Sequence, residues 1–490
     1  MECKGIKLKS TVNPYLPVTR QRHLVYALVE VDPGDVQPVA LTPLNLSLVV
    51  DASRSMSIPI LTEAQFKQLV AQDMAKQKTV DGVKVWQFEV PKGFQIDAPS
   101  NMDFTKEALR VVADHLRPID RFSLVAFAQD ALLMVSNTSG TQRKELLRTI
   151  DRLDRIDLGD ETFMARGMQM GYKQAMPGAT ADTVSRMVVL TDGYTKEEHD
   201  CYTWTRQAKK AGIVVSTMGL GLDFNEELLI SLADVSGGHA YFIDDPKEIP
   251  DAFRQELAGA QSIMWRDLSL AVSLPTDVTL RRAHKVRPAI AQVTVEQIEA
   301  GTERPCIHDS AQTTRISLGD LEAGTNVPFA TVPSAGATVP SAGPAVLLEL
   351  IVPPRPAGTY RLAQITLHGR TATSSVDAYV AYTDQAVDSR DVLVHYTERP
   401  SQAKQTDAHL MAVIQKVSAF KLQNQAIEEA RRGNVAGATR RLRMAGEHLI
   451  EMGEEDLGHT MLVEAELMEK KGQMSAEGTK KLRYGTRKLR

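Results

Sequence analysis

The sequence predicts an α/β protein: a doubly wound, mostly parallel, Rossmann-like sheet inserted in a β-sandwich, followed by a C-terminal α-helical region. Three observations predict this architecture. Between residue 44 and residue 262, apolar strand-like runs alternate with amphipathic helical patterns. Residues 1–43 and 263–400 contain short alternating segments separated by Pro, Gly and Asp. From residue 401 the apolar period becomes 3.6 residues.

Bulk properties limit the classes of function. The 490 residues exceed what one hydrophobic core usually supports, so roughly two to four domains are expected. The net charge is −4 and the isoelectric point is about 6.3, so no global basic field draws the chain to nucleic acid or anionic lipid. We therefore expect protein partners rather than nucleic acid.

The cysteines and the N-terminus indicate a location. Cys3, Cys201 and Cys306 are an odd number without CxxC spacing, which favours a reducing compartment over a disulfide-held secreted protein. The N-terminus has no apolar core of a signal peptide, and no run approaches the roughly twenty apolar residues of a membrane helix. We expect no membrane span and a cytoplasmic location.

Residues 44–262 read as strand, helix, strand in regular alternation, which requires crossover connections and a sheet covered on both faces. The expected strands are 44–50, 120–129, 186–193, 212–221 and 239–244, and the expected helices are 102–116, 141–153, one from near Thr162, 199–212, 225–238 and 247–261.

The flanking segments form two further regions. Residues 1–43 contain two strand-like runs that we expect to pair with the sandwich of 263–400, so that the α/β domain interrupts it. A seven-residue repeat of small residues and Pro at 330–343 predicts a surface loop. Residues 401–490 predict antiparallel helix hairpins, and we expect the basic tail from Lys480 to Arg490 to be a solvated helix end.

The stretch "LVVDASRSMS" (48–57) carries the most specific signal. A strand leaving a parallel sheet delivers its next residues to the crevice where ligands of open α/β sheets bind. In an extended loop, alternate residues point the same way, so Asp51, Ser53 and Ser55 present one carboxylate and two hydroxyls together. An all-oxygen cluster suits a hard cation, Mg²⁺ first, with Mn²⁺ or Ca²⁺ as alternatives.

Two more oxygens are expected at neighbouring strand tips, Thr162 in "LGDETFMARGM" and Asp192 in "VVLTDGYT". Together the five positions resemble the von Willebrand factor type A domain and its metal-ion-dependent adhesion site. The resemblance implies that Ser53 and Ser55 bind the metal directly, Thr162 directly or through water, and the two aspartates mainly through water. Neutral hydroxyl ligands leave the cation electron-poor with an open position, which in that family an acidic residue of a protein partner fills.

The sequence departs from the family pattern near the site. Arg54 stands where Gly is frequent, and Asp160 and Glu161 precede Thr162, where they would add negative charge near the cation. An insertion at 57–101 begins immediately after the serines, and it predicts a helix at 62–77 and a hairpin at 78–91 that turns at Asp81-Gly82. It is either a passive elaboration or a determinant of partner choice, and its acids Glu63, Glu89 and Asp97 are candidates to fill the open position in cis.

Three functions follow. The first is a non-enzymatic, divalent-metal-dependent protein-binding scaffold, similar to bacterial relatives of the inter-alpha-trypsin inhibitor heavy chains and of the calcium-activated chloride channel-like proteins. The second is a metal-assisted hydrolase with Asp160 or Glu161 as general base. In the third, the C-terminal helices provide the main binding surface and the α/β domain is a metal-stabilised scaffold.

Overall fold

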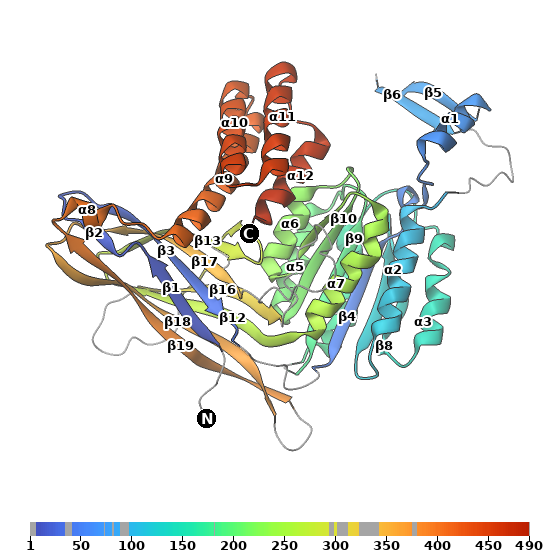
Figure 1. Ribbon diagram of the computed structural model, residues 1–490. Helices are drawn as coiled ribbons and strands as arrows, with labels where there is room; N and C mark the ends of the chain where they lie inside the picture. Colours follow the sequence, from blue (N-terminus) through green and yellow to red (C-terminus); the bar gives the residue numbers. More distant parts are fainter. Residues whose placement is uncertain are drawn as a thin grey trace.

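The computed structural model describes residues 6–34, 42–72, 74–80, 83–88, 98–180, 182–293, 298–300, 312–322, 343–374 and 380–489. Figure 1 shows an α/β domain on one side, a sandwich of long strands on the other, and a group of C-terminal helices rising between them. The predicted fold class is confirmed.

The α/β domain is built on a six-stranded sheet in the order β11-β10-β9-β4-β7-β8. Its parallel strands are β4 (Leu44–Asp51), β7 (Arg121–Phe127), β9 (Val184–Thr191), β10 (Ile213–Leu220) and β11 (Ala240–Ile243). Strand β8 (Ala131–Ser139), an antiparallel edge strand paired with β7, was not predicted from the sequence. Its exposed Leu132 and Leu133 break the alternation expected of a half-buried strand.

Helices cover both faces of this sheet because its strands are apolar on both sides. Leu48 and Val50 pack with helices α2 and α7, whereas Val49 between them packs with α4 and the helices beyond it. The helices are α2 (Asn101–His115), α3 (Arg143–Ile150), α4 (Met164–Ala175), α5 (Glu198–Lys210), α6 (Glu226–Ser236) and α7 (Ile249–Gln261).

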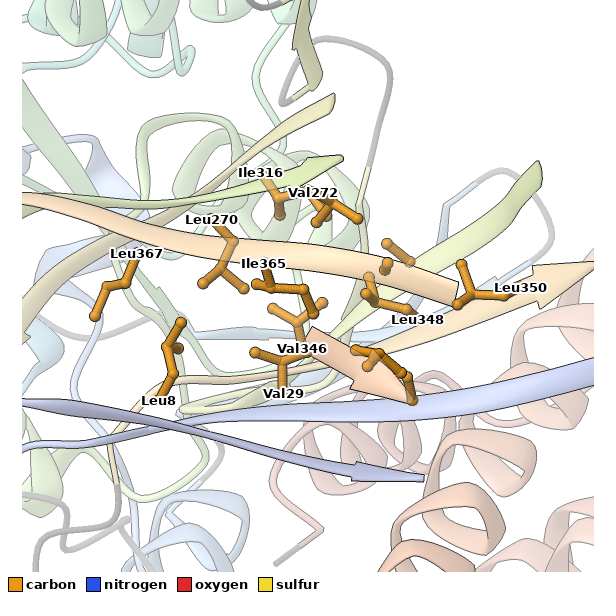
Figure 2. Packing of buried hydrophobic residues seen from close by; sticks show 14 of the residues in the cluster. Leu8, Val29, Leu270, Val272, Ile316, Val346, Leu348, Leu350, Ile365 and Leu367 are labelled. Atoms are coloured by element: carbon orange, nitrogen blue, oxygen red, sulfur yellow. The ribbon is translucent and has the colours of Figure 1, made fainter. Parts of the chain in front are cut away.

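The sandwich has two sheets, in the orders β1-β3-β17-β13-β14 and β15-β16-β12-β18-β19-β2. The N-terminal strands belong to it, since β3 pairs with β17 far along the chain. Figure 2 shows residues such as Val29, Val346 and Leu270 packed between the sheets. The strands are β1 (Lys7–Val12), β2 (Tyr15–Pro17), β3 (His23–Asp32), β12 (Ile263–Leu274), β13 (Thr279–Arg287), β14 (Ala291–Gln292), β15 (Ile298–Ala300), β16 (Gln312–Glu322), β17 (Ala345–Val352), β18 (Gly358–Ser374) and β19 (Val380–Thr397).

The insertion contains a helix and a hairpin, as predicted, although the helix is shorter than expected. Helix α1 (Glu63–Ala71) begins at a capping box formed by Thr62 and Gln65. Strands β5 (Ala75–Val80) and β6 (Val83–Phe88) pair antiparallel. Figure 1 shows these elements beyond the end of the α/β sheet, away from the sandwich. The turn at 81–82 and the repeat at 330–342 lie outside the described residues.

The C-terminal region consists of a short helix, α8 (Pro400–Ala403), and four longer helices, α9 (Ala408–Arg431), α10 (Val435–Glu451), α11 (Glu455–Lys471) and α12 (Ala476–Arg487). The expectation of a solvated basic tail is wrong. Only 2% of the Lys480 side chain and 11% of the Arg487 side chain are exposed, because both are paired with acids of α6. The basic tail is therefore an intramolecular docking element (Figure 1).

No helix in the described ranges is long and apolar enough to cross a membrane.

Candidate metal centre

The sequence-predicted site residues lie at the carboxyl ends of two adjacent strands and on the segment between the short helix η2 (Leu153–Arg155) and α4. Asp51 is the last residue of β4, and Ser53 and Ser55 follow at the start of the short helix η1 (Arg54–Ser57). Asp192 directly follows β9, which pairs with β4. Two buried parallel strands thus deliver one carboxylate each to the same edge of the sheet.

Hydrogen bonds join four of the five residues into one cluster. The Ser53 backbone N–H donates to Asp51 Oδ1 at 2.8 Å, and the Ser53 and Ser55 hydroxyl oxygens are 3.0 Å apart. The Ser55 hydroxyl donates to Asp192 Oδ1 at 2.7 Å. The alternation expected from sequence therefore places both serine hydroxyls on the side of Asp192.

Thr162 lies against the loop that carries Asp192. A Cβ atom added to Gly193 would lie 2.9 Å from Thr162 Oγ1, so the threonine hydroxyl packs directly on the backbone next to Asp192. The Lys196 backbone N–H also donates to the Thr162 carbonyl at 3.4 Å. Glycine at position 193 permits this close approach.

The cluster is buried and negatively charged. Asp51 is fully buried, and burial followed by the charge of Asp192 raises the pKa of Asp51 to about 6. Burial is also the main cause of the raised pKa of Asp192. Two carboxylates that share a buried site disfavour each other's ionisation, and a bound cation would relieve both costs.

The two acids before Thr162 are engaged by neighbouring cations. Asp160 lies 3.7 Å from Arg54, in a pair whose side chains are 72% and 82% exposed, and Glu161 pairs with Lys196. Each pair links the Thr162 loop to another loop of the cluster. Each of these acids therefore has a cation close by, in a solvent-exposed pair of the kind that contributes little stability.

Two polar residues of the cluster were missed from sequence. The Thr191 hydroxyl donates to Asp51 Oδ2 at 2.6 Å, and the Asn101 amide donates to Asp192 Oδ2 at 3.3 Å. The sequence signal for Thr191 was its position directly before Asp192 in "LTDG". Asn101 follows the helix-capping Ser100, but no spacing in the sequence indicates that the insertion returns it to Asp192.

The donor set fits a hard divalent cation. It consists of two carboxylates, three hydroxyls and no sulfur or imidazole, which matches Mg²⁺, Mn²⁺ or Ca²⁺ better than a soft metal. No group of three or more His, Cys, Asp or Glu side chains in the described part of the chain is arranged to hold a metal ion. Any metal bound by this cluster would therefore depend on its hydroxyls.

None of the three candidate acids of the insertion is identified as a ligand for the open position of the cation. Glu63 forms an exposed ion pair with Lys67 one helical turn away, and Glu89 and Asp97 lie outside the described residues.

Family models match two parts of the chain. The von Willebrand factor type A domain matches residues 96–255, and the Sll0103-like C-terminal alpha-helical domain matches residues 408–490. The chain contains a von Willebrand factor type A domain. Domains of this type bind a divalent metal at the adhesion motif in general and mediate protein–protein interaction.

Among bacterial relatives, the uncharacterized protein YfbK of Escherichia coli is 25% identical over 31% of this chain and 27% of its own length. The uncharacterized protein sll0103 of Synechocystis is 26% identical over 45% of this chain and 50% of its own length. A UPF0353 protein of Mycolicibacterium gilvum is 27% identical, over 34% of this chain and 56% of its own. The chain thus spans about a quarter to just over half of these curated relatives.

Two solved structures resemble the whole chain. A von Willebrand factor type A protein from Catenulispora acidiphila has a TM-score of 0.70 at 14% identity, with coverage of 99% of this chain and 97% of that one. The ArnB paralog VWA2 from Sulfolobus acidocaldarius has a TM-score of 0.51 at 14% identity, with 99% coverage of both chains. At this identity the likeness concerns the fold. The expected relationship to the inter-alpha-trypsin inhibitor heavy chains stays a prediction.

Proposed function

We propose that the type A domain is a divalent-metal-dependent protein-binding site that captures an acidic side chain of a partner, with Mg²⁺ as its cation. Asp51, Ser53, Ser55, Thr162 and Asp192 would hold the metal, which supplies a Lewis-acidic position for a carboxylate oxygen. The observation that carries the proposal is the hydrogen-bonded chain from Asp51 through both serines to Asp192.

This chain's own residues prepare the site in two ways. Thr191 and the Ser53 backbone orient Asp51, while Asn101 and Ser55 orient Asp192, so that both carboxylates are fixed before any ligand arrives. Most of the cluster is buried, but Ser55 is exposed. An incoming carboxylate would therefore approach from the side of Ser55.

The hydrolase alternative has less support. Its two possible bases, Asp160 and Glu161, are engaged in ion pairs with Arg54 and Lys196. In the other alternative, the C-terminal helices are the main binding surface. An experiment distinguishes it from our proposal, because it predicts partner binding that does not depend on metal.

The test is affinity capture from an extract of the native cell, with Mg²⁺ or with chelator, using the wild type and Asp192→Ala. The proposal expects a set of proteins that is lost both in chelator and in the variant. Glu107→Gln, which removes an exposed carboxylate on α2, is the charge-matched control and should capture the same set as the wild type. Capture that survives chelator and Asp192→Ala would contradict the proposal.

A further inference from the structure

Two of the most exposed large apolar side chains in the described part of the chain lie next to the metal cluster. Tyr194 is 60% exposed and follows Asp192 by two residues, and Ile58 is 56% exposed and follows Ser55 by three. A single exposed apolar side chain is common on protein surfaces. Large ones that gather at a binding site, however, are typical of a surface that contacts a partner.

Backbone contacts fix Ile58 beside Ser55. The Ile58 N–H donates to the Ser55 carbonyl at 3.1 Å and closes the short 3₁₀ helix η1. In such a helix, side chains three residues apart lie above one another, so Ile58 extends the side of the turn that carries Ser55. The next residue, Pro59, forms a β-bridge with Ser100 at the other end of the insertion. The position of Ile58 is therefore held on both sides.

Tyr194 reaches the same cluster from a second loop. The Ser55 hydroxyl donates to Asp192 Oδ1 at 2.7 Å, and only Gly193 separates Asp192 from Tyr194. Two residues span at most about 7 Å of extended chain. A series of hydrogen bonds and covalent bonds thus leads from Ile58 through Ser55 and Asp192 to Tyr194.

These positions indicate which kind of segment fits the site. A carboxylate that approaches from the side of Ser55 brings the residues next to it in the partner toward Ile58 and Tyr194. Apolar neighbours of the acidic residue would remove both side chains from water, whereas polar neighbours would lose their own hydration for no equivalent gain. Aromatic side chains such as that of Tyr194 frequently contribute most of the binding energy at interfaces.

We propose that Tyr194 and Ile58 are specificity-determining residues of the metal site and that its partner is a protein segment in which apolar residues flank the acidic one. This role rests on the proposed metal-dependent function. Ile58 belongs to the insertion at 57–101, so the insertion takes part in the choice of partner through its first residues.

The experiment is fluorescence polarisation of short labelled peptides with the full chain, in Mn²⁺ or in chelator. One peptide has a central glutamate flanked by leucines, the second has serines in place of the leucines, and the third has leucines around a central glutamine. In Mn²⁺ the leucine-flanked glutamate peptide should bind at least about tenfold more tightly than the serine-flanked one. Binding should be lost in chelator and with the glutamine peptide.

Variants assign this preference to the two residues. Tyr194→Ser should weaken binding of the leucine-flanked glutamate peptide about tenfold and Ile58→Ser about threefold, with little effect on the serine-flanked peptide. Tyr194→Phe retains the ring and should bind like the wild type. Because both residues are exposed, the melting temperature and the calorimetric Mn²⁺ affinity of each variant should stay unchanged.

Met176 provides a matched control. It is 50% exposed and directly follows α4, whose first turn lies beside the site and whose 12 residues place its end about 18 Å away. Met176→Ser removes an equally exposed apolar side chain from the same domain, and it should leave the binding of both glutamate peptides unchanged.

Equal binding of the two glutamate peptides, an equal loss of both in Tyr194→Ser, or a loss in Met176→Ser as large as in Tyr194→Ser would overturn the inference while leaving the proposed function in place. A loss of Mn²⁺ affinity in Tyr194→Ser would also overturn it, because Tyr194 would then support the cluster. Self-association of the wild type that Tyr194→Ser abolishes would assign the surface to a second copy instead. If neither glutamate peptide bound in Mn²⁺, the proposed function and this inference would fail together.

Discussion

Two buried carboxylates in the type A domain have opposite electrostatic environments. Asp51, at the carboxyl end of β4, is acted on by burial, a second carboxylate and hydroxyl or backbone donors, and its pKa rises to about 6. For Glu256 on α7, burial alone would raise the pKa, but hydrogen bonds and charges from His239 and Arg186 lower it to about 2. Glu256 has its cations within the fold, whereas Asp51 has a setting that a cation from solution would improve.

This difference in environment distinguishes a carboxylate that holds the fold together, Glu256, from one that is suited to bind a cation, Asp51. The Glu256 network joins α7 to β9, β10 and the sandwich, since Arg186 is 3.3 Å from Glu322 of β16 and the Ser216 hydroxyl donates to Glu256 at 2.6 Å. It is an internal joint between two domains. In the Asp51 cluster, ionised carboxylates held in a buried place lower the stability of the fold, as is common at functional centres.

The largest effect is expected at the internal joint. Arg186→Met leaves Glu256 and Glu322 without their shared cation, and breaking a buried pair in this way costs about 3–5 kcal/mol. Urea denaturation should show this loss in the free energy of unfolding, while Mg²⁺ affinity stays as in the wild type. A loss below about 1 kcal/mol, typical of exposed pairs, would show that the network is not a structural joint.

The pH dependence of stability should follow from the same network. The folded state binds a proton on Glu256 less readily than the unfolded state, so this contribution is fully present above about pH 4.5 and is lost as the pH falls toward 2. His239 has a raised pKa: burial lowers it, but the hydrogen bond and charge of Glu256 together with the charge of Glu322 outweigh burial. Its contribution is present below pH 6.5 and lost as the pH rises through the folded pKa.

Melting temperatures measured between pH 3 and pH 8 check this window. Glu256→Gln should flatten both limbs relative to the wild type. Identical pH profiles for the two proteins would show that Glu256 does not carry the dependence.

A smaller effect, of opposite sign, is expected for Asp51→Asn. In chelator this variant should be as stable as the wild type or more stable, because it removes a charge that burial and Asp192 disfavour. With Mg²⁺ present it should bind at least about tenfold more weakly, which corresponds to about 1.4 kcal/mol. Thermal melts with and without Mg²⁺ measure both quantities. If the variant were less stable in chelator, Asp51 would be a structural residue like Glu256.

The smallest effect is expected for Gly193→Ala. The added methyl would meet Thr162 Oγ1 at 2.9 Å, so the threonine must shift by a few tenths of an ångström. We expect a loss of metal affinity of about two- to fivefold with little change in stability, measured by calorimetry. Gly221→Ala, at a position with open space but a positive φ of 63°, controls for backbone strain alone.

The sequence predicted most of the fold and the core of the candidate site because both depend on local patterns. Alternating apolar runs identified the strands, and the spacing of Asp51, Ser53 and Ser55 fixed their common side. The role of the basic tail could not be predicted, because Lys480 finds its partners more than 250 residues away in sequence, at Phe224 and Glu226. Asn101 was hidden for the same reason, since its partner Asp192 lies 91 residues further along the chain.

Calorimetric titration of Mg²⁺ into the full chain, compared with a Ser53→Ala plus Ser55→Ala variant, shows whether the serine hydroxyls hold a cation. We expect one binding site per wild-type chain. We also expect thermal stabilisation that grows with the Mg²⁺ concentration and reaches about 2.7 kcal/mol at one hundred times the dissociation constant. The double variant should fold equally well in chelator and bind at least about tenfold more weakly, or about 1.4 kcal/mol. Equal Mg²⁺ binding by both proteins, or none by the wild type, would contradict the claim that these hydroxyls and carboxylates hold a cation.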